Sequence, residues 1–400
     1  LMIQKNSKIR VCHIITSLDA AGAQVLLENV LRHVDHAVFE SVVISLRDRG
    51  VLGKDIQSLG IPVHTLDMDP GRFGVASIFK LRNLMREIRP DLIHGWLYHG
   101  ILLATMGARL AQKTPVLWGI HHLRMDPDTL KWMTRGVIRT CSFLSRWLPE
   151  MSLYVTQDAL DEHIRLGFSP LKTHVMRNGV DVERFVPNPD ARVAFRQQLG
   201  IAEQTKVVGR VGRYTPEKDY RTFIRAAGIL ARRHQDIIFV MCGDDLDDNN
   251  RELAGWLREE GIEGRCHLLG QQKEVWKIIP GFDVMVSSSF SETCPIVLCE
   301  GMACGVVCVA TDVGDSAKIL GDTGHVIPSR NAPRLAEAVS KVTSLTSEQY
   351  ELQSIAARDR IRDEFSIRTI TRHYSDVWKR VARSTSNGNG RVVPGTPLAT

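Results

Sequence analysis

The chain has 400 residues, of which 44% are hydrophobic and 24% are charged, so it can bury the cores of about two or three domains. This composition excludes fibrous, low-complexity and wholly disordered chains, and the lack of about 18 consecutive apolar residues argues against a membrane-spanning helix. The net charge is +6, and the whole excess lies in residues 1–180, which hold 22 Lys/Arg and 16 Asp/Glu.

Short apolar runs alternate with helical patterns through the first half of the chain. Strand-like runs are expected over 9–16, 42–46, 61–66, 92–94 and 115–120, and helices over 22–33, 75–89 and 96–112. Alternation of this kind predicts βαβ units, in which helices cover both faces of a parallel sheet.

The same alternation restarts after a turn-rich seam near residues 178–189. Strands are expected over 206–211, 237–242, 266–269, 282–287 and 306–310, and helices over 219–234, 250–260, 295–304 and 331–343. The predicted fold class is therefore α/β, with two Rossmann-like parallel β/α domains that face each other across a cleft.

The cysteines and the chain ends favour an intracellular protein. The eight cysteines include no CxxC pair and no Cys/His cluster with zinc spacing, so we expect reduced, buried thiols and no disulfide framework. The first residues lack the apolar core of a signal peptide, and the expected location is the cytoplasm. Residues 384–400 are rich in Gly, Ser, Asn and Pro, which predicts a disordered tail.

Residues 282–305 carry two carboxylates around a predicted helix start. A strand ends in a polar loop with Glu292, and a helix is expected to begin near Thr293 and Pro295, with Thr293 as its cap. Free backbone N–H groups at such a start favour a phosphate, and Glu300 would lie about one and a half turns inside the helix. One carboxylate could then lie beside a phosphate-linked group and the other accept hydrogen bonds from a diol. The alternative is two ordinary helix-surface glutamates.

A basic loop follows the strand expected over 206–211. Gly212 allows a close approach of the backbone to a ligand, and Arg213 and Lys218 offer a planar fork and a point charge suited to a diphosphate. A solvated basic turn is the alternative interpretation.

The first half of the chain offers two weaker candidates, both directly after predicted strands. Gly22 opens the first helix, but the segment lacks the GxGxxG pattern, so a dinucleotide site is not supported. His121 follows the strand over 116–120, where a neutral imidazole could hydrogen-bond a sugar hydroxyl or a phosphate, or serve a structural role only.

Three motifs occur in the order of a known family: Asn178-Gly179-Val180-Asp181 with Phe185 and Pro187, Gly212-Arg213 with Lys218, and Glu292 eight positions before Glu300. In this pattern the chain resembles the retaining glycosyltransferases of family 4, which have the GT-B fold, over roughly residues 9–382. The resemblance implies a hexosyltransferase-type enzyme (EC class 2.4) that moves a sugar from a nucleoside-diphosphate sugar to a glycan or lipid-linked acceptor in surface polysaccharide or glycolipid biosynthesis.

The resemblance also implies roles for individual residues. Glu292, His121, Arg213 and Lys218 correspond to catalytic residues: Glu292 and His121 near the transferred sugar, Arg213 and Lys218 at the diphosphate. Donor binding is expected of Glu300 at the ribose and of Gly22, Gly212, Thr293, Cys294, Pro295 and Ile296.

The resemblance further implies an acceptor-binding domain over 1–177, a donor-binding domain over 178–364 and a last helix over 365–383 that returns to the N-terminal domain. Ile370, Tyr374 and Trp378 recur at four-residue spacing there and suit such packing. No cofactor and no obligatory metal are implied, and the Asp244–Asp248 run is interpreted as a solvated loop.

The positive charge of the N-terminal half suggests an anionic membrane surface as a further partner. Residues 131–150 interleave Arg135, Arg139 and Arg146 with Trp132, Phe143 and Trp147. This pattern suits a helix lying on the inner face of the plasma membrane, or an ordinary helix packed on the sheet with its arginines in water. No nucleic-acid partner is expected, because the excess charge is diffuse.

Two other functions share parts of this pattern. A hydrolysing sugar-nucleotide epimerase has the same two-domain architecture, and a non-catalytic sugar-nucleotide-binding protein would retain the donor site alone. The ordered motifs argue against the first, and the complete set of charged residues argues against the second.

Overall fold

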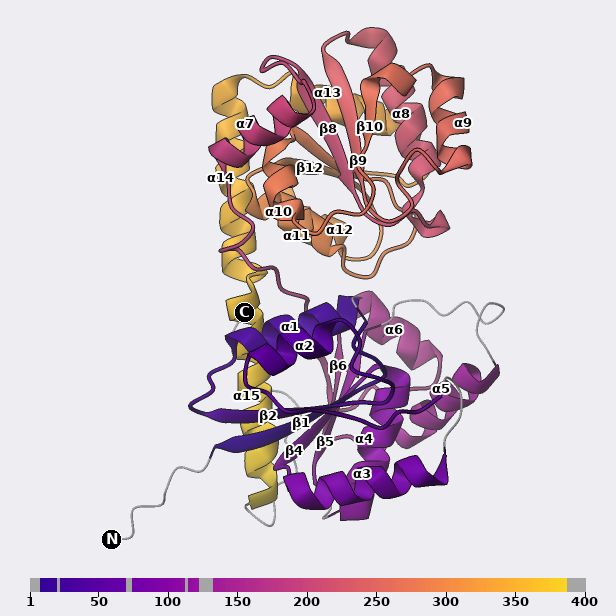
Figure 1. Cartoon of the computed structure of the whole chain (residues 1–400), viewed down its shortest axis with the longest axis vertical. Coiled ribbons are helices and arrows are strands. Elements are labelled where there is room, and N and C mark those ends of the chain that lie inside the picture. The colour runs from indigo at the N-terminus through magenta and orange to yellow at the C-terminus, as the bar shows by residue number, and fades with distance from the viewer. Residues whose placement is uncertain (1–7, 20–21, 70–73, 112–113, 122–131, 387–400) are drawn as a thin grey trace. The chain divides into compact units, whose positions relative to one another are not determined.

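The computed structural model describes residues 8–19, 22–69, 74–111, 114–121 and 132–386. The chain forms two compact units, one made of Leu1–Asn178 and Ile367–Thr400 (unit 1) and the other of Gly179–Ser366 (unit 2), as Figure 1 shows. The units therefore part after residues 178 and 366, whereas the sequence placed its boundaries after 177 and 364.

Unit 1 is built on one sheet in which every pairing between the described strands is parallel. The seven described strands lie in the order β3-β2-β1-β4-β5-β6-β7. They are β1 (Ile9–Ile15), β2 (Phe39–Ser45), β3 (Val63–Thr65), β4 (Leu92–Trp96), β5 (Val116–Ile120), β6 (Met151–Tyr154) and β7 (Thr173–Val175).

Helices cover both faces of this sheet, as a buried parallel sheet requires. One face packs against α1, α2 and α15, and the other against α3, α4, α5 and α6. The bounds are α1 (Gly22–His33), α2 (Leu52–Ser58), α3 (Val75–Ile88), α4 (Leu97–Ala111), α5 (Trp132–Leu144), α6 (Gln157–Arg165) and α15 (Ile367–Ser386).

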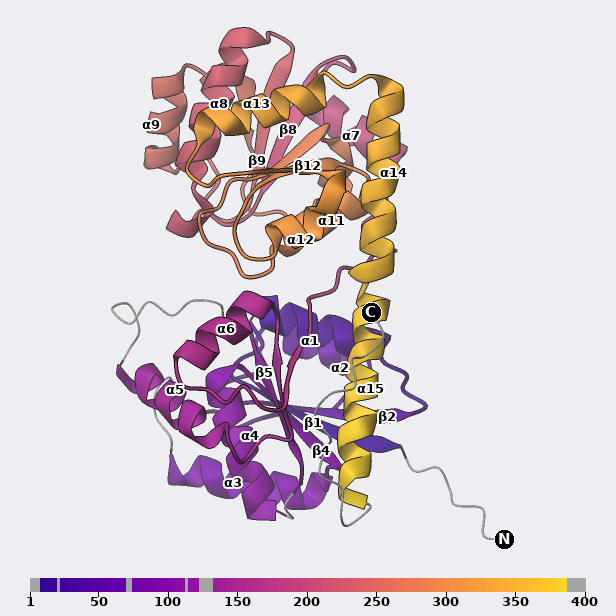
Figure 2. The same cartoon turned by 180° about the vertical axis from the view of Figure 1, so that it is seen from behind.

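The last helix completes the core of unit 1 although it comes from the far end of the chain. Ile370, Tyr374 and Trp378 are almost fully buried, and Trp378 packs edge-on against Phe39 with ring centroids 5.4 Å apart. Figure 2 shows α15 lying along unit 1. The helix extends to Ser386, so the first three residues of the expected tail are helical, and the rest of that tail lies outside the described residues.

Unit 2 repeats the parallel arrangement with six described strands in the order β10-β9-β8-β11-β12-β13. They are β8 (Lys206–Val211), β9 (Ile237–Cys242), β10 (Cys266–Leu268), β11 (Val284–Ser287), β12 (Val307–Thr311) and β13 (His325–Ile327).

The helices of unit 2 also divide between the faces of their sheet. One face packs against α8, α9 and α13, and the other against α7, α10, α11, α12 and α14. The bounds are α7 (Pro189–Gln198), α8 (Tyr220–Arg233), α9 (Arg251–Glu260), α10 (Val275–Ile278), α11 (Ile296–Ala303), α12 (Ser316–Leu320), α13 (Ala332–Thr343) and α14 (Ser347–Glu364).

An ion network ties the entry of unit 2 to its sheet. Asn188 caps α7 by accepting a hydrogen bond from the Ala191 amide at 2.9 Å. From α7, Arg192 and Arg196 both donate to the carboxylate of Asp283, at 2.7 and 2.5 Å, and that carboxylate also accepts the Val207 amide of β8. The turn-rich seam of the sequence thus leads directly into a helix anchored beside β11.

The sequence predicted the element types well in its most regular parts and missed shorter ones. The predicted ranges 22–33, 206–211 and 237–242 match α1, β8 and β9 residue for residue. The short strands β6, β7 and β13 and the polar helices α6, α7 and α14 were not predicted. None of the described helices is long and apolar enough to cross a membrane. All eight cysteines are free thiols, and all except Cys266 are buried.

Two histidines are fully buried beneath α15. His13 of β1 lies beside His94 of β4 in the sheet register, and both side chains are 0% exposed. The Nδ1 of His13 accepts a hydrogen bond from the indole of Trp96 at 3.3 Å, whereas neither ring nitrogen of His94 has a hydrogen-bond partner in the described structure. Burial lowers the pKa of His13 to about 3, and burial together with His13 and His121 lowers the pKa of His94 well below its usual value.

We predict that unit 1 loses stability in mild acid because of these histidines. In the unfolded chain they bind protons below about pH 6.5, and in the folded unit they stay neutral, so the free energy of unfolding falls as the pH drops from about 6.5 towards 3. His94→Leu should flatten this fall by roughly 1–3 kcal/mol between pH 6.5 and 4.5, measured by hydrogen exchange of β1 and β4.

The exposed His36 provides the matched control, and His36→Gln should leave the pH profile of unit 1 unchanged. If the free energy of unfolding of unit 1 falls equally steeply with pH in His94→Leu and in the unmodified protein, the buried His94 is not a cause of the acid sensitivity.

Candidate active site

Both sheets have a point at which the strand order reverses. It lies between β1 and β4 in unit 1 and between β8 and β11 in unit 2. In open α/β sheets ligands bind beyond the carboxyl ends of the strands at such a point, because the loops diverge there. In unit 2 these loops contain Gly212–Lys218 after β8 and Ser288–Glu292 after β11, which the sequence singled out.

A close crossing of two backbones fixes the loop after β8. Gly212 has φ of 156° and Gly243, after β9, has φ of 153°, a region that favours glycine. A Cβ on Gly243 would lie 1.9 Å from the Gly212 carbonyl oxygen, so no larger residue fits. The hydroxyl of Tyr220 donates to the same carbonyl at 2.6 Å. The start of the basic loop is thus held rigidly.

An ion pair joins the two loops. The Nζ of Lys218 lies 2.5 Å from Oε1 of Glu292, and both side chains are largely buried, with 21% and 12% of their surface exposed. The hydroxyl of Ser289 donates to the same carboxylate oxygen at 2.8 Å. The second oxygen of Glu292 makes no hydrogen bond in the described structure, and it remains able to accept one from a ligand.

Beneath this pair lies a buried arginine that the sequence reasoning missed. Arg210 of β8 is 2% exposed and its guanidinium donates to the hydroxyl of Ser288 at 2.5 Å and to the carbonyl of Lys218. It also stacks on the ring of Tyr220, 4.2 Å from the centroid. A charged residue flanked by apolar residues and glycine near the end of a predicted buried strand was the signal that could have revealed it.

The helix that follows Glu292 starts later than expected. α11 begins at Ile296 with Pro295 in the cap position, and no side chain caps it, so the prediction that Thr293 caps the helix is wrong. The reason is a tight contact with a neighbouring loop: the Thr293 carbonyl accepts the Asp315 amide at 3.0 Å, and a Cβ on Gly314 would lie 2.4 Å from that carbonyl oxygen. Cys294 and Pro295 are buried at this uncapped helix start.

Glu300 lies on α11 just over one turn beyond Ile296. Dense surroundings raise the pKa of its carboxyl from 4.5 to about 7, although part of the side chain stays exposed. No described residue hydrogen-bonds to or forms an ion pair with the carboxyl group of Glu300, whose backbone carbonyl accepts the Cys304 amide within the helix. A carboxylate in this state suits hydroxyl donors from a ligand, since such hydrogen bonds favour its charged form. Arg213, three residues beyond Arg210 and in the loop after β8, is exposed.

The two remaining candidates lie in unit 1, after β1 and β5. Gly22 is the first residue of α1, and a Cβ there would meet no atom within 4 Å, so its position is open rather than crowded. His121 stacks on Trp96 with ring centroids 5.0 Å apart and planes within 9° of parallel. Trp96 in turn stacks on Tyr374 of α15. A column of aromatic rings thus fixes the orientation of the His121 imidazole.

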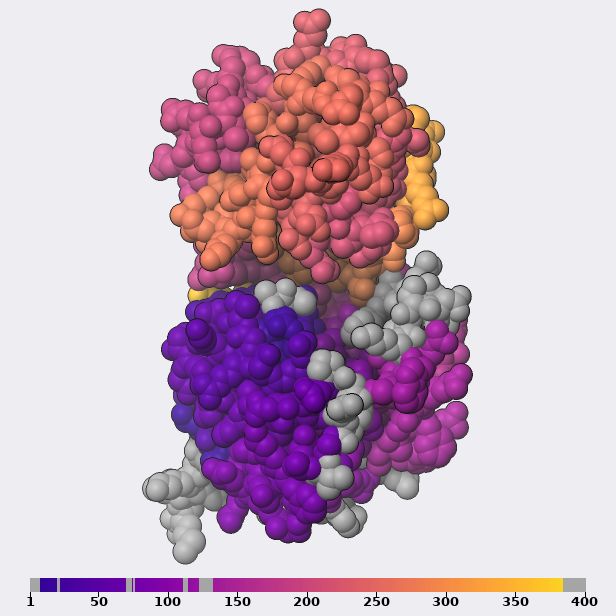
Figure 3. All heavy atoms as spheres, turned by 45° about the vertical axis from the view of Figure 1, so that its right-hand side comes forward, coloured from indigo at the N-terminus to yellow at the C-terminus, as the bar shows by residue number. Residues whose placement is uncertain are grey.

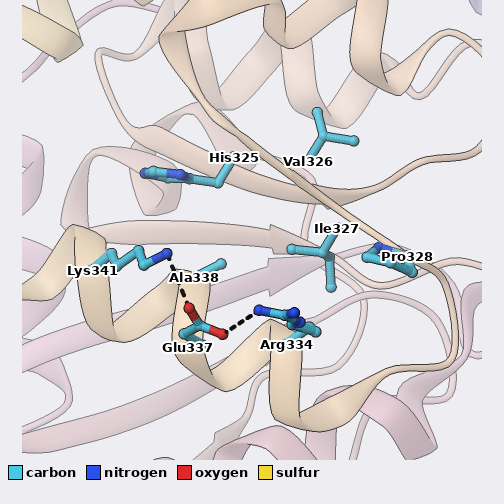
Figure 4. A pocket seen from close by; sticks show the side chains of 8 residues that line it. All are labelled: His325, Val326, Ile327, Pro328, Arg334, Glu337, Ala338 and Lys341. Carbon is cyan, nitrogen blue, oxygen red and sulfur yellow. Dashed lines mark hydrogen bonds and ion pairs between the residues drawn. The ribbon is translucent and has the colours of Figure 1, made fainter.

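Unit 2 also contains a cavity that none of the candidate residues line. A cavity of about 300 Å³ lies between β13 and α13, and in it Glu337 pairs with both Arg334 and Lys341, as Figure 4 shows. Across the described part of the chain no group of three His, Cys, Asp or Glu residues could hold a metal ion. In the Asp244–Asp248 loop, Asp247 accepts the backbone amide of Asn249.

Comparison with known families covers both units. Residues 20–184 match the family described as Glycosyltransferase Family 4, and residues 192–360 match Glycosyl transferases group 1. The two matches follow one another along the chain, one for each unit.

Individual relatives agree with the family. The chain is 22% identical to the putative glycosyltransferase EpsF of Bacillus subtilis over 77% of this chain and 80% of that protein. It is 23% identical to the Escherichia coli UDP-Gal:alpha-D-GlcNAc-diphosphoundecaprenol alpha-1,3-galactosyltransferase over 73% of this chain and 76% of that protein.

The fold is shared with Anabaena Alr3699/HepE, solved in complex with UDP and glucose. The TM-score is 0.79 at 20% identity, and the match covers 93% of this chain and all of that one. These comparisons give no support to the epimerase or the non-catalytic binding protein. With its two parallel-sheet units and both family matches, the chain belongs to the family 4 glycosyltransferases of the GT-B fold and is a hexosyltransferase-type enzyme.

Proposed function

We propose that the protein transfers a hexosyl group from a nucleoside-diphosphate sugar to a glycan or lipid-linked acceptor, with retention at the anomeric carbon. The observation that carries the donor assignment is the Lys218–Glu292 pair together with Glu300 on the helix that follows Glu292, whose carboxylate has no ion-pair partner among the described residues. We propose that the Lys218 cation, the Glu292 carboxylate and the Glu300 carboxylate bind the diphosphate, the sugar and the ribose of one donor, respectively.

The contact between Lys218 and Glu292 fits the covalent order of such a donor. The diphosphate is bonded directly to the transferred sugar, so a cation for the first and a hydrogen-bond acceptor for the second must be neighbours. Lys218 and Glu292 are neighbours at 2.5 Å. Ser289 and Arg210 hold this pair from beneath, through the Glu292 carboxylate and the Lys218 carbonyl. We therefore assign Lys218 to the diphosphate and Glu292 to the sugar hydroxyls.

In the proposed reaction the bond between the anomeric carbon and the diphosphate oxygen breaks and its electron pair stays on that oxygen. The acceptor hydroxyl forms the new bond on the same face of the sugar, and its proton passes to the departing diphosphate. Lys218, Arg213 and the start of α11 stabilise the charge that develops on the phosphate oxygens. We propose that these groups replace a metal ion, so the enzyme has no obligatory cofactor.

Gly22 and His121 are proposed to contribute from unit 1, Gly22 through an open backbone at the start of α1 and His121 through a rigid imidazole. His121 is proposed to lie near the transferred sugar. The relatives support the substrate class, because the Escherichia coli protein is named for UDP-galactose and a lipid-diphosphate acceptor and the Anabaena structure holds UDP and glucose.

Glu300→Gln tests donor binding. The variant should lose most of its affinity for the donor nucleotide, at least about tenfold in Kd, because an amide cannot replace an ionised acceptor for two hydroxyls. Isothermal titration with UDP, GDP and ADP would measure this and identify the nucleotide. Unchanged affinity for every nucleotide bound by the unmodified protein would refute the role of Glu300.

The same substitution should stabilise the empty protein at alkaline pH. The folded pKa of Glu300 near 7 lies above its ordinary 4.5, so its contribution to stability is present below pH 4.5 and is lost as the pH rises through 7. At pH 8, Glu300→Gln should raise the free energy of unfolding by roughly 1–3 kcal/mol, and at pH 4 it should change it little. Chemical denaturation at the two pH values measures the difference.

Lys218→Gln tests the leaving-group assignment. Loss of a fixed cation at the departing diphosphate should lower kcat by about 100- to 1,000-fold, with a smaller effect on KM. Lys277→Gln is the matched control, since Lys277 is an exposed lysine of unit 2 that pairs only with Glu274 in the described structure.

Dialysis against EDTA tests the proposed independence from a metal ion. Activity that survives the dialysis would support it, and activity that is lost and then restored only by a divalent cation would overturn it.

We also propose that the protein is cytoplasmic and binds peripherally to an anionic membrane through α5. The buried face of α5 contains Val137 and Cys141, whereas Trp132 and Phe143 lie on the opposite face with 80% and 65% of their surface exposed. Trp147 follows, 60% exposed, with its ring 5.0 Å from Phe143. The aromatic side chains thus point away from the core, together with the exposed Arg139 and Arg146.

Figure 3 shows the purple atoms of the α5 region at the surface of unit 1. Phe143→Ser with Trp147→Ser should reduce flotation with phosphatidylglycerol vesicles at low salt by at least about tenfold, and Arg135→Glu with Arg139→Glu should act in the same direction. Leu352→Ser is the control, since Leu352 is equally exposed but lies on α14 of unit 2. Equal flotation of all four proteins would overturn the membrane assignment.

A further inference from the structure

A second cavity, of about 480 Å³, lies within unit 1 between the end of α1, the start of β2 and α15. Arg32 and Asp35 contribute from α1 and the turn after it, and Phe39 from β2. This place is at the amino ends of the strands, because α1 ends and β2 begins there. His121 follows the carboxyl end of β5, so the cavity is separate from the candidate active-site residues of unit 1.

Cations without carboxylate partners distinguish this cavity. Arg372 and Lys379 lie seven positions apart on α15, which places them on one stripe of the helix. Neither forms an ion pair within the described residues, although Asp376 lies between them along the helix. In the cavity between β13 and α13 of Figure 4, by contrast, Glu337 neutralises both basic residues.

A buried hydroxyl also lines the cavity without a partner. Thr371 is 3% exposed, and its Oγ1 makes no hydrogen bond in the described structure. The neighbouring hydroxyl of Ser375 is already used, since it donates to the Thr371 carbonyl at 2.8 Å. Burying an unsatisfied hydroxyl costs free energy, and a ligand oxygen that accepts from Thr371 would recover that cost.

We propose that this cavity binds an anionic saccharide, meaning a sugar that carries a phosphate or carboxylate group. Arg372, Lys379 and the Thr371 hydroxyl suit the anionic group. Asp35 and Asp376 can only accept hydrogen bonds, so they repel a bare anion but bind sugar hydroxyls. A ligand with both kinds of group satisfies the whole lining, and the volume lies within the range of small-molecule sites, about 300–1,000 Å³.

Calorimetric titration of the whole protein with glucose 6-phosphate tests the proposal, with glucose and inorganic phosphate as comparisons. Glucose 6-phosphate should bind at least about tenfold more tightly than either. The double variant Arg372→Gln with Lys379→Gln should weaken binding of glucose 6-phosphate by about tenfold or more. Arg380 is an exposed arginine of the same helix outside the cavity, so Arg380→Gln should leave that binding unchanged. Equal affinity for inorganic phosphate, or equal binding by the double variant, would overturn the proposal.

Thr371→Val separates a binding role from a structural one. The variant keeps the side-chain shape and removes the unpartnered hydroxyl, so its thermal stability should not fall, while its affinity for glucose 6-phosphate should fall several-fold. Unchanged affinity would contradict the proposal. Glu300→Gln should retain glucose 6-phosphate binding, and loss of binding in that variant would assign the ligand to the donor site instead.

Discussion

The parallel pairing of β8 with β11 is the constraint on which the candidate active site depends. Val208 pairs with Val284 although the two strands belong to distant parts of the sequence. Loops that leave the carboxyl ends of adjacent parallel strands emerge side by side, and this brings Lys218 within 2.5 Å of Glu292. The loop after β8 supplies Lys218 and the loop after β11 supplies Glu292, so the candidate site needs both loops. The ion pair, the Ser289 hydrogen bond and the contact of Arg210 with both loops all follow from that one register.

The residues packed beneath the candidate site include buried polar side chains, Arg210 and Ser288, at positions where most of the core is apolar. Arg210 is buried and has no carboxylate partner among the described residues; its guanidinium contacts the Ser288 hydroxyl, a backbone carbonyl and the ring of Tyr220, while its Nε makes no hydrogen bond there. Burial of an unpaired cation is costly, so this arrangement lowers the stability of unit 2 relative to an apolar residue. It keeps the two loops in register and adds positive potential beneath the pair.

Local sequence patterns were sufficient for the regular elements and for the nearness of Lys218 and Glu292. The alternation of apolar runs predicted the β/α order, and the positions of these two residues after strands predicted that they lie at one edge of the sheet. The roles assigned to them and to Glu300 stay predictions. Arg210, Ser289 and the pair His13–His94 were missed because their roles arise from neighbours distant in sequence. The Thr293 cap was wrong for the same reason, since the Asp315 amide binds the Thr293 carbonyl and Gly314 approaches it closely.

The two carboxylates of the site differ in their surroundings more than their sequence positions suggest. Glu292 faces a cation and a hydroxyl, whereas Glu300, eight positions on, has no described partner and a pKa near 7. A group poised near neutrality changes charge at little cost, so hydroxyl donors from a ligand are enough to ionise it. Lys218 already forms an ion pair with Glu292 and can bind the diphosphate through the hydrogen atoms of its ammonium group that this pair leaves unused. On the role proposed for Glu300, nucleotide binding should therefore release a proton from its carboxyl near pH 7 and so couple donor affinity to pH.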